Sequence, residues 1–149
     1  MTLVKGIDTP RAVWQQSVQD VLNFGDTTNT PGSPEVGVTF RAPTSGRVLV
    51  IVGGGLRDNA GQNRVFLGPE VYQGPDTRGT KVESGSFHEF VTSPPEPEAM
   101  FASRATLVTG LTAGETYYAR TYYYTLKTGG TPSATSDIFV REIIVVPVP

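Results

Sequence analysis

The chain of 149 residues contains no cysteine and a single histidine, His88. Without thiols it has no disulfide framework, no thiolate zinc site and no cysteine nucleophile. His88 stands between Phe87 and Glu89 in a strand-like segment, and no second histidine is present to share a metal or to complete a catalytic triad. We therefore expect no catalytic residue, no metal site and no cofactor, and we predict that the protein is not an enzyme.

Charge is also scarce, at 17% of residues, and neither sign dominates, because the formal net charge is -2. A chain without a basic surface is a poor ligand for phosphates, so we expect no nucleic-acid partner. The longest mostly apolar run, Val48–Leu56, is interrupted by three glycines, and the first residues contain no apolar h-region. We therefore expect neither a membrane span nor a signal peptide.

What the chain has in quantity is turn-forming residues, with 17 glycines and 12 prolines spread along its length. Together with 38% apolar residues, this composition is typical of a folded, turn-rich protein rather than a disordered or collagenous one. The length fits a single globular domain.

Residues 10–23 have the spacing of a short amphipathic helix. Thr9 offers a hydroxyl N-cap, Pro10 suits the first helical position, and Gly25 can end the helix. Apolar residues recur at i, i+4, i+7 and i+8 along one stripe. This stripe consists of Trp14, Val18, Val21 and Leu22.

The stretch Asp26–Glu35 has no apolar residue, except for prolines, and is typical of a linker. The predicted helix is therefore separate from the rest of the chain. We divide the protein into an N-terminal arm of residues 1–35, with a role in attachment, and a body of residues 36–149.

From residue 36 onward, short β-rich runs alternate with turn residues, which predicts seven or eight strands. Such a pattern favours an all-β fold, and we expect an antiparallel, jelly-roll-like β-sandwich preceded by the short helix and arm. The expected strands are Val36–Ala42, Arg47–Val52, Asn63–Tyr72, Phe87–Thr92, Met100–Thr109, Glu115–Lys127 and Thr135–Val146.

Two features of the loops invite a binding-site interpretation that the sequence does not support. Gly53–Gly55 follows a strand, but neither a third spaced glycine nor a Gly-Lys-Ser/Thr ending comes after it, so we predict a turn and not a phosphate loop. The acidic residues of the predicted loops lack EF-hand spacing, so we expect them to be solvated. They are Asp58, Asp76, Glu96 and Glu98.

Two late strands carry bulky side chains on both faces, namely Tyr117–Tyr124 and Ile138–Val146. A lone sandwich of this size leaves one such face in water, so a subunit interface is a reasonable inference. The tyrosines can alternatively form a contact surface for a sugar or a protein. The residues that we assign to the subunit interface are Tyr118, Tyr122, Tyr124, Phe139, Ile143 and Val145.

Two segments resemble known families. Val38–Val50 resembles the F-x-A-P-x-x-G-x-V-x-V opening of small jelly-roll domains in phage structural proteins and, more distantly, of trimeric tumour-necrosis-factor and complement-type heads. Val108–Tyr117 together with Ile138–Pro149 is similar to the closing strands of actinobacterial-phage fibre, decoration and minor tail proteins. The resemblance implies a homotrimer around a three-fold axis, an N-terminal arm bound to the particle, no active site and no cofactor.

A competing resemblance rests on Leu111–Tyr117, which is similar to the tyrosine corner of fibronectin type III sandwiches. In those sandwiches a tyrosine hydroxyl bonds to upstream backbone. The tryptophan expected on an early strand is missing here, because the only tryptophan is Trp14.

These observations favour a non-enzymatic virion protein that decorates a capsid, as a minor capsid or head-fibre protein assembled in the host cytoplasm. Its partners are the major capsid protein or other virion proteins, and its attachment residues are Trp14, Val18, Val21 and Leu22. The alternative is a tail or baseplate adhesin that touches a host glycan with loops such as Asn59–Asn63 or Pro75–Gly79. A third hypothesis is a small cellular lectin or carbohydrate-active enzyme that uses Glu89, Glu115 or Glu142.

Overall fold

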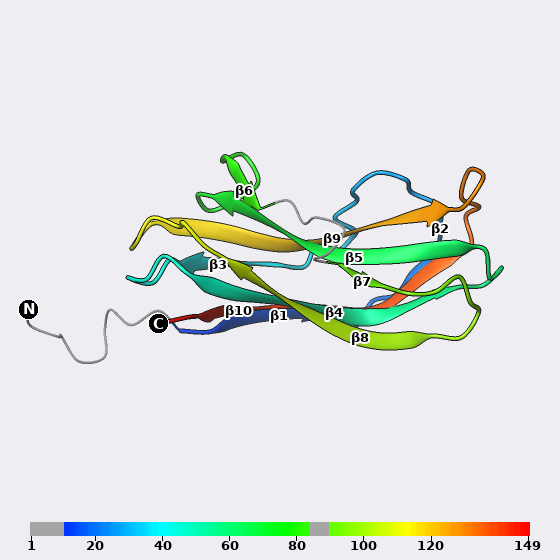
Figure 1. The fold of residues 1–149 in the computed structure, drawn as a ribbon, viewed down its shortest axis with the longest axis horizontal. Helices are drawn as coiled ribbons and strands as arrows, with labels where there is room; N and C mark the ends of the chain where they lie inside the picture. The colour runs from blue at the N-terminus through cyan, green and yellow to red at the C-terminus, as the bar shows by residue number, and fades with distance from the viewer. Residues whose placement is uncertain (1–10, 84–89) are drawn as a thin grey trace, which may run out of the picture.

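The computed structural model describes residues 11–83 and 90–149, and within these ranges it contains strands and loops but no helix (Figure 1). This part of the chain accordingly has no helix that can cross a membrane. Thr9, Pro10, His88 and Glu89 lie outside the described residues. The strands are β1 (Val13–Ser17), β2 (Val21–Phe24), β3 (Gly37–Arg41), β4 (Val48–Asp58), β5 (Asn63–Gln73), β6 (Lys81–Glu83), β7 (Val91–Thr92), β8 (Met100–Val108), β9 (Thr116–Lys127) and β10 (Ser136–Pro147).

The strands form two antiparallel sheets that lie face to face (Figure 1). Sheet A has the order β1-β10-β4-β8, and β2 continues the edge along β10; sheet B has the order β3-β9-β5-β6, and β7 also pairs with β5. The chain alternates between the sheets from β2 to β5 and again from β7 to β10, which is jelly-roll connectivity. The predicted all-β, jelly-roll-like sandwich is therefore confirmed.

The helix predicted over residues 10–23 is wrong, because the described part of this segment forms β1 and β2. Strand β1 pairs along its whole length with residues 141–145 of β10. Ser17 and Phe24 are buried, whereas Trp14, at the start of the supposed apolar stripe, is 66% exposed. The backbone partners that β10 offers decide the conformation, since local helix propensity is weak beside tertiary contacts.

The N-terminal segment is consequently built into the sandwich rather than separated from it. Residues 13–24 supply one edge of sheet A, and the polar stretch Asp26–Glu35 crosses from sheet A to sheet B. On the way, Thr30 and Tyr123 of β9 exchange two backbone hydrogen bonds of 2.9 Å. A role of residues 1–35 in attachment stays a prediction.

The space between the sheets is filled by every second residue of the long strands. Val48, Val50 and Val52 of β4 are fully buried, as are Ile143 and Val145 of the neighbouring β10. Because strand side chains alternate between faces, the residues between these positions lie on the outer face of sheet A.

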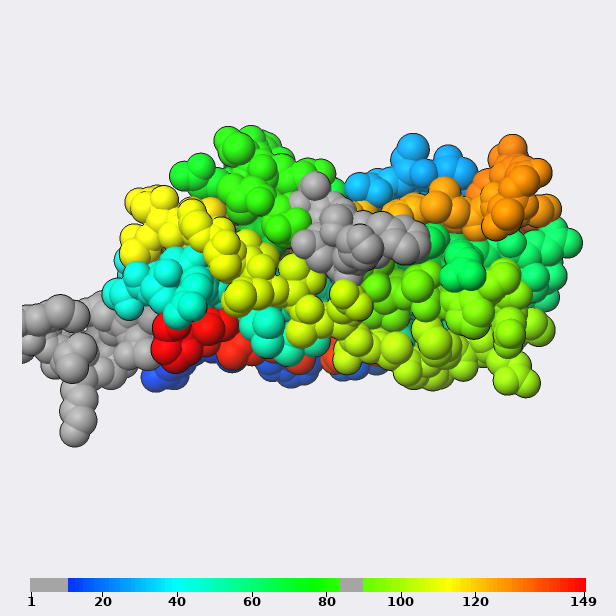
Figure 2. Space-filling view, viewed as in Figure 1, coloured from blue at the N-terminus to red at the C-terminus, as the bar shows by residue number. Residues whose placement is uncertain are grey.

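Part of the outer face of sheet B is covered by β6 and by Phe90, which belong to the described part of the connection from β5 to β8. Phe90 packs edge-on against Tyr122 and Tyr124, with ring centroids 5.1 and 5.3 Å apart. Lys81 of β6 forms a 2.6 Å ion pair with the buried Glu70 on the same face. In the space-filling view the segment with β6 stands above sheet B, whereas β1, β10 and β8 form the lower boundary of the molecule (Figure 2). The outer face of sheet A carries large exposed side chains, among them Trp14, Phe101 and Leu107.

A buried carboxylate fastens the loops at one end of the sandwich. Asp58, at the end of β4, accepts hydrogen bonds from the backbone N–H groups of Asn63 and Gln62 and from the hydroxyls of Thr135 and Ser136. Burial alone would raise the pKa of Asp58, but these hydrogen bonds outweigh it and hold the pKa below its ordinary value. The expectation that Asp58 is solvated is wrong, since its residue is fully buried.

Candidate functional site: a groove on sheet A

The strand register arranges the outer-face side chains of sheet A in rows that run across the strands. A polar row crosses all four strands and lies between an aromatic row and an apolar row. The polar row is Gln16 of β1, Glu142 of β10, Gly53 of β4 and Ser103 of β8. The aromatic row is Phe139, Gly55 and Phe101, and the apolar row is Trp14, Ile144, Ile51 and Ala105.

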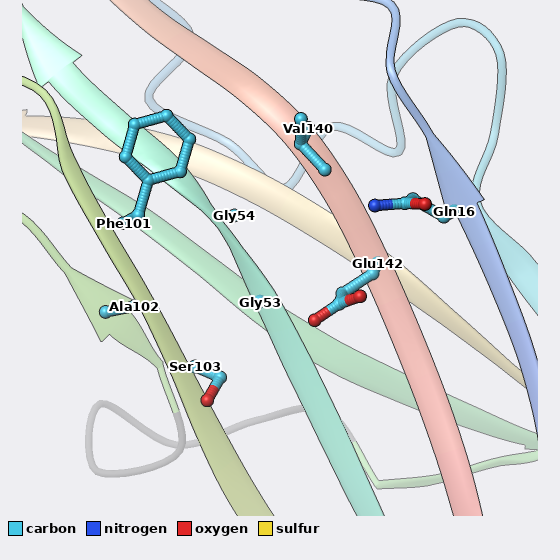
Figure 3. Close-up of a pocket in the computed structure, with 8 residues that line it drawn as sticks. All are labelled: Gln16, Gly53, Gly54, Phe101, Ala102, Ser103, Val140 and Glu142. Carbon is cyan, nitrogen blue, oxygen red and sulfur yellow. The ribbon is translucent and has the colours of Figure 1, made fainter.

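A groove of about 340 Å³ follows the polar row. In Figure 3, Glu142 of β10 and Ser103 of β8 extend toward the stretch of β4 at Gly53 and Gly54, which has no side chains. The volume lies at the lower end of the range of about 300 to 1,000 Å³ that is common for small-molecule sites. The lining consists of Gln16, Gly53, Gly54, Phe101, Ala102, Ser103, Val140 and Glu142.

Three consecutive glycines of β4 form the floor of the groove or lie beside it, each for a different steric reason. A Cβ on Gly53 would stand 3.0 Å from Oε1 of Glu142, and a Cβ on Gly55 would stand 2.5 Å from the ring of Phe101. A Cβ on Gly54 would stand 2.5 Å from the carbonyl oxygen of Val140. The turn predicted for Gly53–Gly55 is wrong, because all three residues lie inside a continuous strand.

A β-bulge places Val140 at the groove. The register of β10 against β4 shifts between Phe139 and Arg141, and Val140, the extra residue, has a φ of 48°. For a β-branched residue this left-handed conformation is strained by about 1 to 3 kcal/mol. Bulges and strained residues are concentrated near functional sites, where they redirect side chains. The strain at Val140 therefore marks this groove as a functional candidate.

The polar groups of the groove are available to a ligand. Glu142 is half-buried, and its carboxylate has no ion pair or hydrogen-bond partner among the residues that the structure describes. Gln16 and Ser103 are exposed on either side of Glu142. Their side-chain polar atoms likewise have no hydrogen-bond partner among the residues that the structure describes. Together these groups provide a carboxylate acceptor, an amide donor and acceptor, and a hydroxyl.

The aromatic row forms a firm wall. Phe101 is 67% exposed and lies over Gly55, and Phe139 follows on the other side of that glycine. The guanidinium of Arg57 lies 4.9 Å from the centre of the Phe139 ring, and its Nε donates to Asp137 at 2.8 Å. A ligand in the groove thus meets apolar ring surface beside polar side chains.

The described residues contain no group of three or more His, Asp or Glu side chains that could hold a metal ion. Asp76 is paired with Arg78, and Glu142 is the one carboxylate among the eight residues that line the groove. Hydrolysis of a glycosidic bond ordinarily uses two carboxyl groups on either side of the bond. The lining of the groove therefore supplies one of the two carboxyl groups that this chemistry ordinarily uses.

The proposed attachment residues do not form a helical stripe. Trp14, Val18 and Leu22 are exposed by 66%, 76% and 52%, whereas Val21 packs against the core. They lie along β1, β2 and the loop between them, and their role in attachment is still a prediction.

The proposed interface residues divide into two groups. Ile143 and Val145 are core residues, and Tyr122 belongs to the aromatic cluster on sheet B; all three are buried within one chain. The partly exposed residues are Tyr118, Tyr124 and Phe139, for which a subunit contact stays a prediction.

The structure contains the hydrogen bond of a tyrosine corner but not the strand order of a fibronectin type III sandwich. The backbone N–H of Thr112 donates to the hydroxyl of Tyr117 at 2.9 Å, as in a tyrosine corner. The strand order is nevertheless that of a jelly roll.

Comparison with known proteins assigns the chain to no family. No protein-family model matches the chain, and no curated protein is significantly similar in sequence. Solved structures with a similar arrangement of strands include a carbohydrate-binding module of a laminarinase from Zobellia galactanivorans. It has 10% sequence identity and a TM-score of 0.32, and the match covers 91% of this chain and 99% of that chain. A carbohydrate-binding module of a Cellvibrio mixtus lichenase, solved with cellotriose, has 6% identity, a TM-score of 0.35, and coverage of 89% and 98%.

A further similar structure comes from Bacillus endospore appendages, with 17% identity, a TM-score of 0.27, and coverage of 85% of this chain and 100% of that chain. At such identities the similarity concerns the fold alone.

Proposed function

We propose that this protein is a non-enzymatic, saccharide-binding β-sandwich displayed on a bacteriophage particle, with the groove on sheet A as its binding site. The observation that carries the proposal is the polar row on a glycine floor, bounded by the ring of Phe101, which shares its row with Phe139. The particle setting depends on the resemblance of Val38–Val50 and the closing strands to phage structural proteins.

The chemistry of the groove selects among ligand classes. A phosphate is disfavoured, because Glu142 contributes negative charge and none of the eight lining residues is cationic. An extended peptide is disfavoured as well, because β4 is paired on both sides and its backbone has no free edge in the groove. A sugar has hydroxyl groups for Glu142, Gln16 and Ser103, and apolar ring faces for the aromatic wall.

The proposal favours the adhesin over capsid decoration. The decoration hypothesis depends on an N-terminal attachment device that is separate from the displayed body. In the structure β1 and β2 belong to sheet A, and Gln16 of β1 lines the groove. The N-terminal segment thus contributes to the candidate binding surface itself. Sequence analysis expected a glycan contact at loops Asn59–Asn63 or Pro75–Gly79. In this proposal the glycan instead binds the outer face of sheet A.

The test is a glycan array followed by calorimetric titration of the best ligand with the full chain. Gly53→Val fills the floor at a position where its nearest neighbour is the flexible end of Glu142, and Phe101→Ala removes the wall. We expect each to weaken binding at least tenfold. Thr39→Ala, on an exposed position of sheet B, should bind as the wild type does.

Thermal unfolding must show that the variants are folded. A folded wild-type protein that binds no glycan would contradict the proposal. So would a ligand that binds Gly53→Val and Phe101→Ala with undiminished affinity.

A further inference from the structure

A buried arginine lies between the two sheets without an acidic partner. Arg141 of β10 follows the bulge at Val140, and its residue is fully buried. A guanidinium stays protonated in folded proteins, so Arg141 carries its positive charge into the interior. No ion pair in the described part of the chain includes Arg141. A buried charge without compensation is strongly unfavourable, so this residue requires an explanation.

The guanidinium of Arg141 uses one of its nitrogens and leaves one whole edge free. Nη1 donates to the carbonyl oxygen of Pro31 at 3.3 Å. Nε and Nη2 are buried and have no hydrogen-bond partner among the described residues. These two nitrogens form one side of the planar group, and their N–H bonds point in parallel toward the same place. This is an edge with which arginine clamps an anionic group.

The surroundings of Arg141 are tightly packed and include further unused polar groups. A Cβ on Gly32 would overlap Nη1 of Arg141 and stand 2.9 Å from the ring of Tyr123, so the backbone of Gly32 lies against both side chains. Thr121 and Thr125 flank Tyr123 on the same face of β9, because strand side chains alternate. Both threonines are fully buried, and their hydroxyl oxygens have no hydrogen-bond partner in the part of the chain that is described.

The buried carboxylates of the described residues are engaged elsewhere. Glu70 faces two cationic side chains, and Asp137 pairs with Arg57. Asp58 accepts the hydrogen bonds of the loops that it fastens. Arg141 is thus the buried charge that these carboxylates leave without a counter-charge. Unpartnered buried groups of this kind point to a bound ion or water.

We infer that Arg141 binds a small monovalent anion inside the sandwich, held by its Nε and Nη2, as a structural ligand of the fold. A water molecule would satisfy these N–H groups but would leave the positive charge uncompensated. A halide ion such as chloride suits the enclosed position, because one atom accepts both N–H groups and brings no further polar atom that needs a partner. Arg141 does not line the groove, so this inference does not depend on the proposed function.

The experiment compares thermal unfolding of the full chain in sodium chloride and in sodium methanesulfonate, each at about 0.3 M, since a ligand that binds only the folded state raises the midpoint. We expect the wild type to unfold at least about 3 °C higher in chloride. Arg141→Met removes the charge and keeps an apolar side chain, so this difference should disappear. Arg64→Met, at an exposed position, is the matched control and should retain it. General effects of the two salts act on both variants alike.

Bromide provides a second readout that needs no variant. Crystals of the wild type grown with sodium bromide should show an anomalous-scattering peak beside Nε and Nη2 of Arg141, and this measurement decides the matter if Arg141→Met does not fold. Equal wild-type midpoints in the two salts would overturn the inference, as would a chloride effect that Arg141→Met retains. Bromide peaks confined to the molecular surface would overturn it as well.

Discussion

The carbonyl oxygen of Val140 lies 2.5 Å from the point that a Cβ on Gly54 would occupy. The bulge in β10 and the glycine in β4 therefore depend on each other, because a side chain at position 54 would push the bulge away from the sheet. The groove owes its shape to this pair: the bulge supplies Val140 to its lining, and the glycine permits the bulge.

Gly54→Ala should destabilise the protein by about 2 kcal/mol, because a methyl group overlaps backbone that cannot easily move. Gly53→Ala is the matched control, since its methyl group would meet backbone no closer than the Ala102 carbonyl oxygen at 3.4 Å, and its nearest neighbour, at 3.0 Å, is the movable end of Glu142. Urea unfolding at neutral pH measures both changes. Equal midpoints for the two variants would show that the close approach at Gly54 has no energetic weight.

Glu142→Gln should weaken saccharide binding about tenfold, since a hydrogen bond to a charged acceptor is worth more than one to a neutral amide. Glu115→Gln, at an exposed turn position, should leave affinity unchanged. Titration calorimetry measures affinity, and a reducing-sugar assay on the same samples measures cleavage. We expect no cleavage by the wild type; sugar release that disappears in Glu142→Gln would identify an enzyme instead.

Asp58 should make stability depend on pH. Its pKa is lower in the folded protein than in the unfolded chain, where it is about 3.9, so its contribution is present above that value. As pH falls through the folded pKa, this contribution is lost. Asp58→Asn should therefore be about 2 kcal/mol less stable than the wild type at pH 7, and the difference should narrow between pH 4 and pH 2.

Thermal unfolding across this pH range, with Asp76→Asn as control, tests the role of Asp58. Asp76 is a partly exposed loop residue paired with the exposed Arg78, so its substitution should leave the unfolding midpoint nearly unchanged. A constant difference between wild type and Asp58→Asn at every pH would show that the hydrogen bonds, and not the charge, carry the effect.

The strands of the body could be predicted because their side chains alternate or are apolar throughout. The sequence predicts a strand over Asn63–Tyr72, and β5 spans Asn63–Gln73. It predicts another over Met100–Thr109, and β8 spans Met100–Val108. Turn residues mark the ends of such strands well. The second strand was expected to end at Val52, but β4 continues through the glycines to Asp58.

The edge strands β1 and β2 could not be predicted because their partner is distant in the sequence. The spacing of Trp14 and Val18 suits a helix, but both side chains are exposed and neither decides the conformation. What holds β1 is backbone pairing with residues 141–145 and a hydrogen bond of 2.6 Å from the N–H of Gly37 to the Gln15 side chain.

The groove could have been suspected from one signal. Glycines within a strand weaken it, and they often mark a place where another group approaches the backbone closely. Gly53–Gly55 directly follows five apolar residues and so invited a turn assignment. The partners that make the glycines meaningful, Glu142 and Phe101, come from strands far along the chain, and only the register brings them together.

The antiparallel pairing of β1 with β10 also determines how the domain responds to pulling. Val13 lies beside Val145, so both strands leave the sandwich at the same end. Tension between those two ends would open the pair like a zipper, one hydrogen bond after another. Tension between those ends and a saccharide held on the sheet would instead load many rungs of the ladder at once, because these bonds run perpendicular to the strands. An adhesin with this geometry would resist detachment forces transmitted through its ligand better than forces that separate its own ends.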